Sequence, residues 1–207
     1  MLKLKRFPLL LVSLMGHLTI LLTFSGSVTP AYGQTVGQGI PSWGQGPYEV
    51  IIFADYFCPP CKRIDAKAEG LFKELVASEK VKLTFVDVPF NRATPTYAKY
   101  YLYAVKADAG INNALHVRNV LFEAAQGRRV QDENALVAFL KEKNTAWKAM
   151  NEKSVFPHLS AVIKEHKVDA TPTCVIKYSA KDIKKYVGDD EIWDGLTKFK
   201  AHLWTVK

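Results

Sequence analysis

The sequence predicts an α/β fold in which a single sheet carries an inserted subdomain of helices. Apolar, β-branched runs at 50–53 and 81–88 are typical of buried strands, and a helical pattern lies between them. From about residue 95 to residue 167 the pattern is helical, and strand signals return only after it. Two strands, a block of helices, a hairpin and a last helix together indicate one domain at 48–207 with a helical insertion.

The first 33 residues, 1–33, are predicted to be a signal peptide for export. A short cationic start precedes an apolar stretch at 7–24 and small, turn-forming residues up to Gly33, which fits cleavage before Gln34. An uncleaved anchor formed by 7–24 is the alternative, although polar residues interrupt this stretch. Both alternatives place the domain in the periplasm or another extracytoplasmic compartment, where disulfides form and persist.

The composition favours a globular protein without an extended surface for nucleic acids. The 207 residues are 48% hydrophobic, and 28 basic against 20 acidic side chains give a formal net charge of +8. Three of the basic residues lie in the predicted signal peptide: Lys3, Lys5 and Arg6. The remaining excess is spread over lysine-rich helices, as on a solvated surface, so we expect no nucleic-acid partner.

The elements before the insertion follow from local patterns. Residues 34–47 are rich in glycine and glutamine and should form a flexible leader. After the first strand, apolar residues recur at helical spacing from Ile64 to Val76, so a helix with one buried face runs to about Lys80. Pro89 ends the strand that comes next.

The insertion, at about 95–167, shows three apolar helical faces in succession. Three aromatic residues of the first face are expected in the core: Tyr97, Tyr100 and Tyr101. Asp132 can cap the third helix. Strand patterns return at 173–178 and 183–187, and Gly188 separates them from the last helix.

The segment between the first strand and the first helix carries the chemistry. It reads Phe53-Ala-Asp-Tyr-Phe-Cys58-Pro-Pro-Cys61-Lys62. Two residues between cysteines, wound into the first turn of a helix, bring the sulfurs within disulfide distance, and the helix N-terminus favours a thiolate. Cys58 is therefore the expected nucleophile and Cys61 the buried resolving partner. Pro59 fits an early helical position because its fixed φ is already helical.

Metal binding is the main alternative for these two cysteines. Zinc normally takes four ligands, and the sequence has neither a second Cys-X-X-Cys nor a Cys/His pair at ligand spacing. Cys174 is the only other cysteine, and it reads as a buried, redox-silent side chain in a strand. We predict no metal site. The second interpretation is a copper-binding or copper-protective protein that uses Cys58 and Cys61 as soft ligands for Cu(I).

Two separated motifs resemble those of the thioredoxin superfamily, and within it the DsbA-like thiol:disulfide oxidoreductases of bacterial envelopes. The segment around Cys58 and Cys61 is similar to the active-site segment of the family, and Val-Asp-Ala-Thr171-Pro172-Thr is similar to its cis-proline loop. The resemblance covers the chain from Pro47 onward, including the long helical stretch between the two motifs. It implies a thioredoxin fold with an inserted helical subdomain.

The resemblance also assigns roles to residues near the cysteines. It implies that the Thr171–Pro172 bond is cis and that the backbone of Thr171 pairs with a substrate chain as an added strand. Five further residues flank the cysteines in the motif: Asp55, Tyr56, Pro59, Pro60 and Lys62. Asp55 is either a polar group at the edge of the site or a turn residue.

The motif departs from the family in ways that bear on the acidity of Cys58. Ile52 stands where many relatives carry a buried acid, and no histidine lies between the cysteines. Pro60 removes an amide that could have donated to the Cys58 thiolate. We therefore expect a Cys58 pKa closer to about 7, as in thioredoxin, than to about 3.5, as in DsbA.

The resemblance implies an exported enzyme that forms, reduces or isomerises disulfides in cysteine-containing envelope proteins. The redox-active Cys58–Cys61 pair is itself the electron carrier, so no organic cofactor is implied, and a membrane redox partner resets the pair. The direction stays open between an oxidase and a reductase or isomerase.

Overall fold

The computed structural model describes residues 39–205. The predicted signal peptide at 1–33, with its alternative as an anchor at 7–24, lies outside the described residues, as does the start of the leader. Within 39–205, no helix has the length and apolar character needed to cross a membrane.

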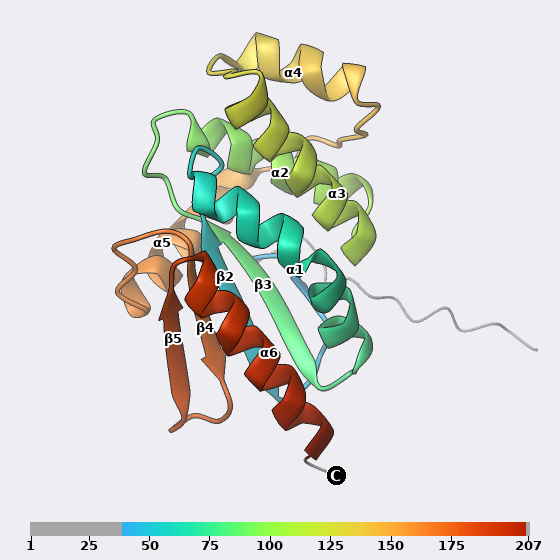
Figure 1. Cartoon of the computed structure of the whole chain (residues 1–207). Helices are drawn as coiled ribbons and strands as arrows, with labels where there is room; N and C mark the ends of the chain where they lie inside the picture. The colour runs from blue at the N-terminus through green and yellow to red at the C-terminus, as the bar shows by residue number, and fades with distance from the viewer. Residues whose placement is uncertain (1–38, 206–207) are drawn as a thin grey trace, which may run out of the picture. The chain divides into compact units, whose positions relative to one another are not determined.

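Five strands form one mixed sheet in the order β1-β3-β2-β4-β5 (Figure 1). The strands are β1 (Ser42–Trp43), β2 (Tyr48–Ala54), β3 (Val81–Asp87), β4 (Thr173–Lys177) and β5 (Ile183–Val187). β2 and β3 run parallel with Ile52 opposite Phe85, and the other three pairs are antiparallel, with Ile52 of β2 opposite Cys174 of β4. The parallel pair is joined by a helix, as this geometry requires.

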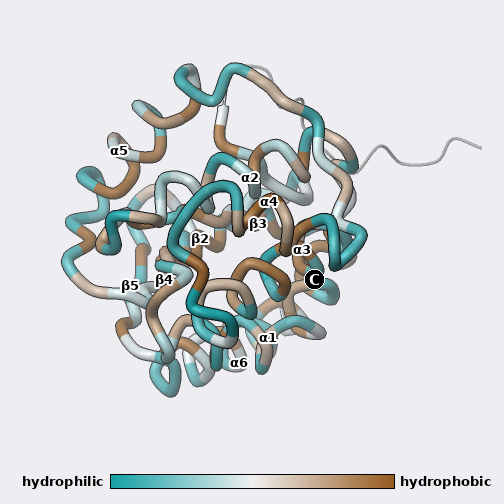
Figure 2. The backbone as a smooth tube through the Cα atoms, turned by 90° about the horizontal axis from the view of Figure 1, so that it is seen from above, coloured by the Kyte–Doolittle hydropathy of each residue, from teal (hydrophilic) through white to brown (hydrophobic). Residues whose placement is uncertain are grey.

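Helices cover both faces of the sheet. They are α1 (Pro59–Ala77), α2 (Thr94–Ala107), α3 (Ile111–Phe122), α4 (Glu133–Glu142), α5 (Phe156–Glu165) and α6 (Asp189–Thr205), with a π-helical turn at Glu123–Gly127 and a 3-10 turn at Glu152–Ser154. Helices α1 and α6 lie on one face, and α5 lies on the other (Figure 1). Figure 2 shows hydrophobic and hydrophilic segments alternating along α5, as in an amphipathic helix.

The alternation of side chains along β2 divides the core in two. Val50 and Ile52 belong to the larger cluster, which also contains the buried residues of α1 and α6. Ile51 and Phe53 belong to the smaller cluster with Leu159 of α5. Because β2 is buried on both faces, it reads as a continuous apolar run rather than an alternating one. The predicted thioredoxin fold with a helical insertion is confirmed by this arrangement.

The insertion consists of α2 to α5, as the helical pattern predicted. The three tyrosines of α2 expected in the core are all buried: Tyr97, Tyr100 and Tyr101. Asp132 caps α4, since its side chain accepts a hydrogen bond from the backbone N–H of Ala135 at 2.8 Å.

The flexible leader predicted at 34–47 is wrong for its second half. Ser42 and Trp43 form β1 and pair with the edge of β3, and Trp43 is 1% exposed. Gly44 has a φ of +77°, and a Cβ on Gly46 would lie 1.7 Å from the backbone of Lys80. These glycines therefore allow a close approach of two backbone segments, which is a different use of glycine from flexibility.

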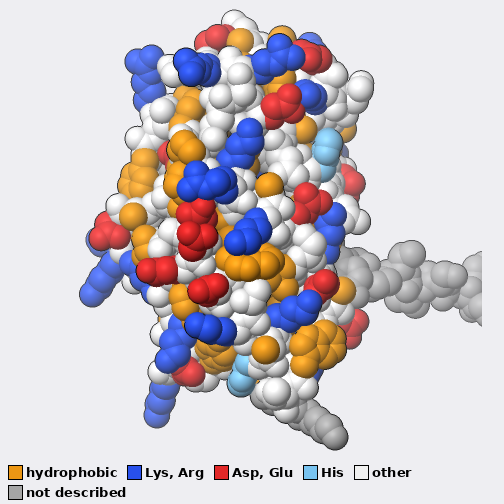
Figure 3. Space-filling view, viewed as in Figure 1, with side chains coloured by type: hydrophobic (Ala, Val, Ile, Leu, Met, Phe, Trp, Pro, Cys, Tyr) orange, Lys and Arg blue, Asp and Glu red, His pale blue; other side chains and the backbone are white. Residues whose placement is uncertain are grey.

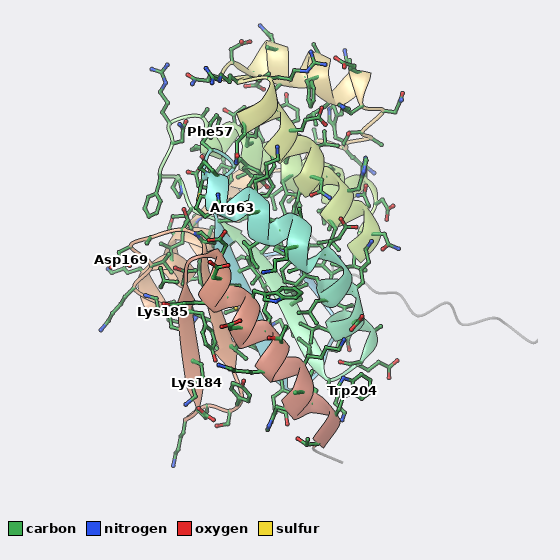
Figure 4. The ribbon with its side chains drawn as sticks, viewed as in Figure 1. Phe57, Arg63, Asp169, Lys184, Lys185 and Trp204 are labelled. Carbon is green, nitrogen blue, oxygen red and sulfur yellow. The ribbon has the colours of Figure 1, made fainter. Side chains whose placement is uncertain are left out.

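Opposite charges alternate over the face formed by α1 and α6 (Figure 3). Arg63 of α1 pairs with Asp189 at the start of α6 at 2.7 Å, and Lys200 pairs with Glu74 further along the same two helices. Arg63 is labelled in Figure 4, where it lies on α1 beside the beginning of α6. These exposed pairs align the two helices but contribute little to stability individually.

Candidate active site

Cys58 lies where β2 ends and α1 begins, at the N-cap of the helix. Its sulfur accepts a hydrogen bond from the backbone N–H of Cys61 at 3.4 Å. Pro59 and Pro60 have no N–H, so the amide of Cys61 is the first one of the helix that can point to the sulfur. Cys58 is partly exposed, and Cys61 is 1% exposed.

The two sulfurs differ in acidity as well as in exposure. A hydrogen bond with the Cys61 side chain lowers the pKa of Cys58 to about 6, with help from the Thr171 side chain and the Cys61 backbone, while burial opposes the shift. Burial and the neighbouring Cys58 raise the pKa of Cys61. The pKa of Cys58 is thus closer to the value of about 7 in thioredoxin than to the value of about 3.5 in DsbA, as expected from Pro60 and the missing histidine.

The loop before β4 faces the cysteine pair. The Thr171–Pro172 peptide bond is cis, and Pro172 is buried. The thiol of Cys58 donates to the carbonyl oxygen of Thr171 at 3.3 Å, although the two residues are far apart in the sequence. The carbonyl of Pro172 accepts from the N–H of Gly188 at 3.0 Å, which ties the loop to the turn before α6.

Asp55 connects three segments beneath the cysteines. Its carboxylate is 2% exposed and accepts from the N–H of Phe57 at 2.7 Å, from the N–H of Asn91 at 2.9 Å and from the hydroxyl of Thr94 at 2.9 Å. Asp55 is therefore a buried junction between the active-site loop and the start of α2, which is more than either of its two predicted roles. Its negative charge raises the pKa of Cys58.

The other flanking residues point in different directions. Tyr56 is 1% exposed and packs against the ring of Phe122, with ring centroids 5.2 Å apart, so it belongs to the core. Pro59 and Lys62 are exposed, and Pro60 is half-buried. None of the sequence patterns distinguished these orientations.

A hollow of about 300 Å³ lies beside the Cys58 sulfur. It is lined by Asp55, Phe57, Cys58, Phe90, Asn91 and Thr171. Phe90, which is 57% exposed, forms an apolar part of its wall. Phe57, which is labelled in Figure 4, lies in the loop between β2 and α1. The hollow leaves space for a polypeptide segment next to the sulfur.

A buried ionic cluster that the sequence patterns did not reveal lies behind the active-site loop. Arg118 of α3 is fully buried and contacts Asp65 of α1 at 2.8 and 2.9 Å and Asp87 of β3 at 3.7 Å. Its guanidinium also stacks 4.2 Å from the ring centroid of Phe85. Burial raises the pKa of Asp87 to about 6, although Arg118 opposes the shift. The sequence did offer one sign of this cluster, because Arg118 stands on the apolar face of a helix predicted in the insertion.

The third cysteine is separate from this site. Cys174 is fully buried in β4, and burial raises the pKa of its thiol. Among residues 39–205, no group of three or more His, Cys, Asp or Glu side chains is arranged to hold a metal ion.

Comparisons with known proteins agree with this architecture. The family model described as thioredoxin matches residues 44–187. The structure is similar to alpha-DsbA1 of Wolbachia pipientis, with a TM-score of 0.58 and 16% identity over 79% of this chain and 92% of that chain. It is also similar to ScsC of Proteus mirabilis in a transitional conformation, with a TM-score of 0.57 and 20% identity over 80% of this chain and 73% of that chain. A third similar structure is oxidised BdbD of Bacillus subtilis, with a TM-score of 0.50 and 21% identity over 77% of this chain and 91% of that chain.

A search of curated proteins gives no match to the sequence. The likeness to solved structures is a likeness of fold, and the family match covers both the cysteine pair and the Thr171–Pro172 loop. The chain therefore belongs to the thioredoxin family and has the DsbA-like form of its fold, as the two sequence motifs predicted.

Proposed function

We propose that this protein is an exported thiol:disulfide oxidoreductase that exchanges disulfides with cysteine-containing proteins of the cell envelope. The observation that carries the proposal is the asymmetry of the two sulfurs. Cys58 is partly exposed with a pKa lowered to about 6, whereas Cys61 is buried with a raised pKa. A nucleophile that ionises at neutral pH beside a protected second thiol is what the exchange reaction needs.

Disulfide exchange through this pair proceeds in two steps. The Cys58 thiolate attacks one sulfur of a substrate disulfide, which breaks that bond, forms a mixed disulfide and releases the other substrate sulfur as a thiolate. Cys61 then loses its proton and attacks the Cys58 sulfur, which releases the second substrate thiolate. The substrate disulfide is reduced and the Cys58–Cys61 pair is oxidised; the reverse sequence transfers a disulfide to a substrate dithiol.

The Thr171–Pro172 loop is proposed to hold the substrate backbone. In the thiol form, the carbonyl of Thr171 accepts from Cys58. Once the proton leaves the sulfur, that carbonyl is free to accept from a backbone N–H of an extended substrate chain, which adds as a strand beside the active site. The hollow next to Cys58 provides room for this chain.

The pair itself carries the electrons, so no organic cofactor takes part in the proposed reaction. A membrane redox partner outside this chain resets the pair after each turnover. We place the reaction in the periplasm or another extracytoplasmic compartment, because disulfides persist there. A Cys58 pKa of about 6 lies between the extremes of the superfamily, so the direction of electron flow has to be measured.

The test uses a Cys174→Ala background, which removes the buried third thiol from the readout. The dithiol form should reduce a model protein disulfide, and the Cys58→Ser variant should not. Equilibration against glutathione then gives the direction: a potential near about −120 mV indicates an oxidase, and about −200 to −270 mV indicates a reductase or isomerase. Tight binding of Cu(I) without any exchange activity would replace this proposal by the copper-binding interpretation.

A further inference from the structure

One side chain from the helical insertion reaches the active-site loop directly. The side-chain amide of Gln126 donates to the backbone carbonyl of Tyr56 at 2.9 Å and to that of Cys58 at 3.0 Å. Gln126 thus bridges the backbone carbonyls of the two residues that flank Phe57. It is contributed by a segment distant in the sequence, at the end of α3.

The backbone around Gln126 is unusual in a way that matters for its reach. Residues Glu123–Gly127 form a π-helical turn, closed by a hydrogen bond from the N–H of Arg128 to the carbonyl of Glu123 at 3.1 Å. Gln126 lies within this turn, so its side chain leaves the backbone in a different direction from the one that a regular continuation of α3 would give it. Such π-helical insertions are frequent at functional sites.

The carbonyl of Cys58 opens α1, and its partner within the helix is the N–H of Lys62, at 3.3 Å. A carbonyl oxygen has two lone pairs, so it can also accept from the side chain of Gln126. Asp55 holds the other side of the loop through the N–H of Phe57. Gln126 donates to two backbone carbonyls of the loop, whereas Asp55 accepts from one of its backbone N–H groups. Together, the side chains of Asp55 and Gln126 hold the loop from both sides.

We propose that Gln126 is a positioning residue, which fixes the backbone of Cys58 so that its sulfur stays in line with the N–H of Cys61. The importance of this role for catalysis rests on the proposed function. The effect of Gln126 on the acidity of the Cys58 thiol does not depend on that function. The S···H–N bond of 3.4 Å depends on the angle at the donated hydrogen, so a rotation of the Cys58 backbone weakens it. Loss of Gln126 therefore destabilises the thiolate and, with it, the reduced form of the pair.

Two substitutions separate positioning from packing. Gln126→Met keeps the length of the side chain and removes the donor, and Gln126→Glu keeps the shape and places acceptor oxygens against two carbonyls. Gln131→Ala is the matched control, because Gln131 is an exposed glutamine of the same subdomain, whose side-chain oxygen accepts from Arg92 at 3.4 Å. All variants carry Cys174→Ala, and each is compared with the protein that carries this change alone.

The readouts are the pKa of Cys58, followed by thiolate absorbance, and the reduction potential against glutathione. We expect the pKa to rise by about half a unit to one unit in Gln126→Met, the equivalent of one net hydrogen bond, and by more in Gln126→Glu. The potential should become more negative in the same order, and Gln131→Ala should change neither quantity.

An unchanged or lowered Cys58 pKa in folded Gln126→Met or Gln126→Glu protein would overturn the inference, even if the melting temperature fell. The thiol titration does not require enzymatic turnover. A wild-type protein without exchange activity but with the expected pKa shifts would therefore refute the proposed function and leave the role of Gln126 standing.

Discussion

Replacing Asp87 with asparagine should change the pH dependence of stability. Asp87 is buried at the end of β3, 3.7 Å from Arg118, and Arg118 already has a closer carboxylate partner in Asp65. The cluster therefore holds one positive and two potentially negative groups. The asparagine has the same shape, but it cannot take the second negative charge.

The magnitude follows from the pKa of Asp87, which is about 6 in the folded protein against an ordinary value of 3.8. Because the folded-state pKa is raised, the stabilisation is complete below pH 3.8 and is lost as the pH rises through 6. At 1.36 kcal/mol per unit, the wild-type protein loses about 3 kcal/mol across this window through Asp87 alone. The Asp87→Asn variant does not titrate at this position. Its free energy of unfolding relative to wild type should therefore increase by up to about 3 kcal/mol as the pH rises from 3.8 through 6.

The assay is urea denaturation of both proteins at intervals between pH 4 and pH 8. The disulfide form is used so that Cys58 does not titrate, and the difference between the two curves removes the groups that they share. Asp189→Asn is the control, since Arg63 lowers the pKa of Asp189 at the surface. Because that pKa lies below 3.8, Asp189 titrates below the range of the assay, so the difference between this control and wild type should stay nearly constant from pH 4 to pH 8.

Parallel stability curves for wild type and Asp87→Asn would refute this reasoning. Such a result would mean that Asp87 stays ionised across the whole range, held by Arg118 more strongly than burial opposes it. A difference that decreases with rising pH would refute it in the same way, because it requires a lowered pKa.

Three further substitutions test other parts of the structure. Cys61→Ser should trap mixed disulfides between Cys58 and substrate proteins, visible on non-reducing gels, and an absence of trapped species would contradict the assignment of Cys61 as the resolving thiol. Trp43→Ala should cost about 3–5 kcal/mol in urea denaturation, whereas Trp204→Ala, at a residue 71% exposed, should stay within about 0.5 kcal/mol; equal effects would refute the structural role of β1. Asp55→Asn removes a negative charge that raises the pKa of Cys58, so the thiol should titrate at lower pH, and a rise would argue that the lost hydrogen bonds dominate.

Local patterns were sufficient for the order of the elements. The strands at 50–53 and 81–88, the helical insertion and the closing hairpin all depend on hydrophobic period, which a single segment displays by itself. The cysteine pair and the Thr171–Pro172 loop were recognisable for the same reason, since each motif is a short contiguous run.

Contacts between distant segments were not predictable in this way. Arg118 and Asp65 lie on different helices, and no periodicity connects them. Gln126 reaches the loop from a π-helical turn, and a pattern with a 3.6-residue period does not show where such a turn occurs. Gly44 and Gly46 were read as flexible because glycine is equally typical of mobile linkers and of tight backbone contacts.

The position of β1 has a practical consequence for anyone who shortens this protein. The family match spans 44–187, and the first long strand starts at Tyr48, so both boundaries invite a cut just after Trp43. A chain trimmed to 44–187 would leave the edge of β3 without its partner strand, and it would lack the whole of α6. An unpaired strand edge invites aggregation. Soluble expression therefore requires a chain that begins before Ser42 and extends through Thr205.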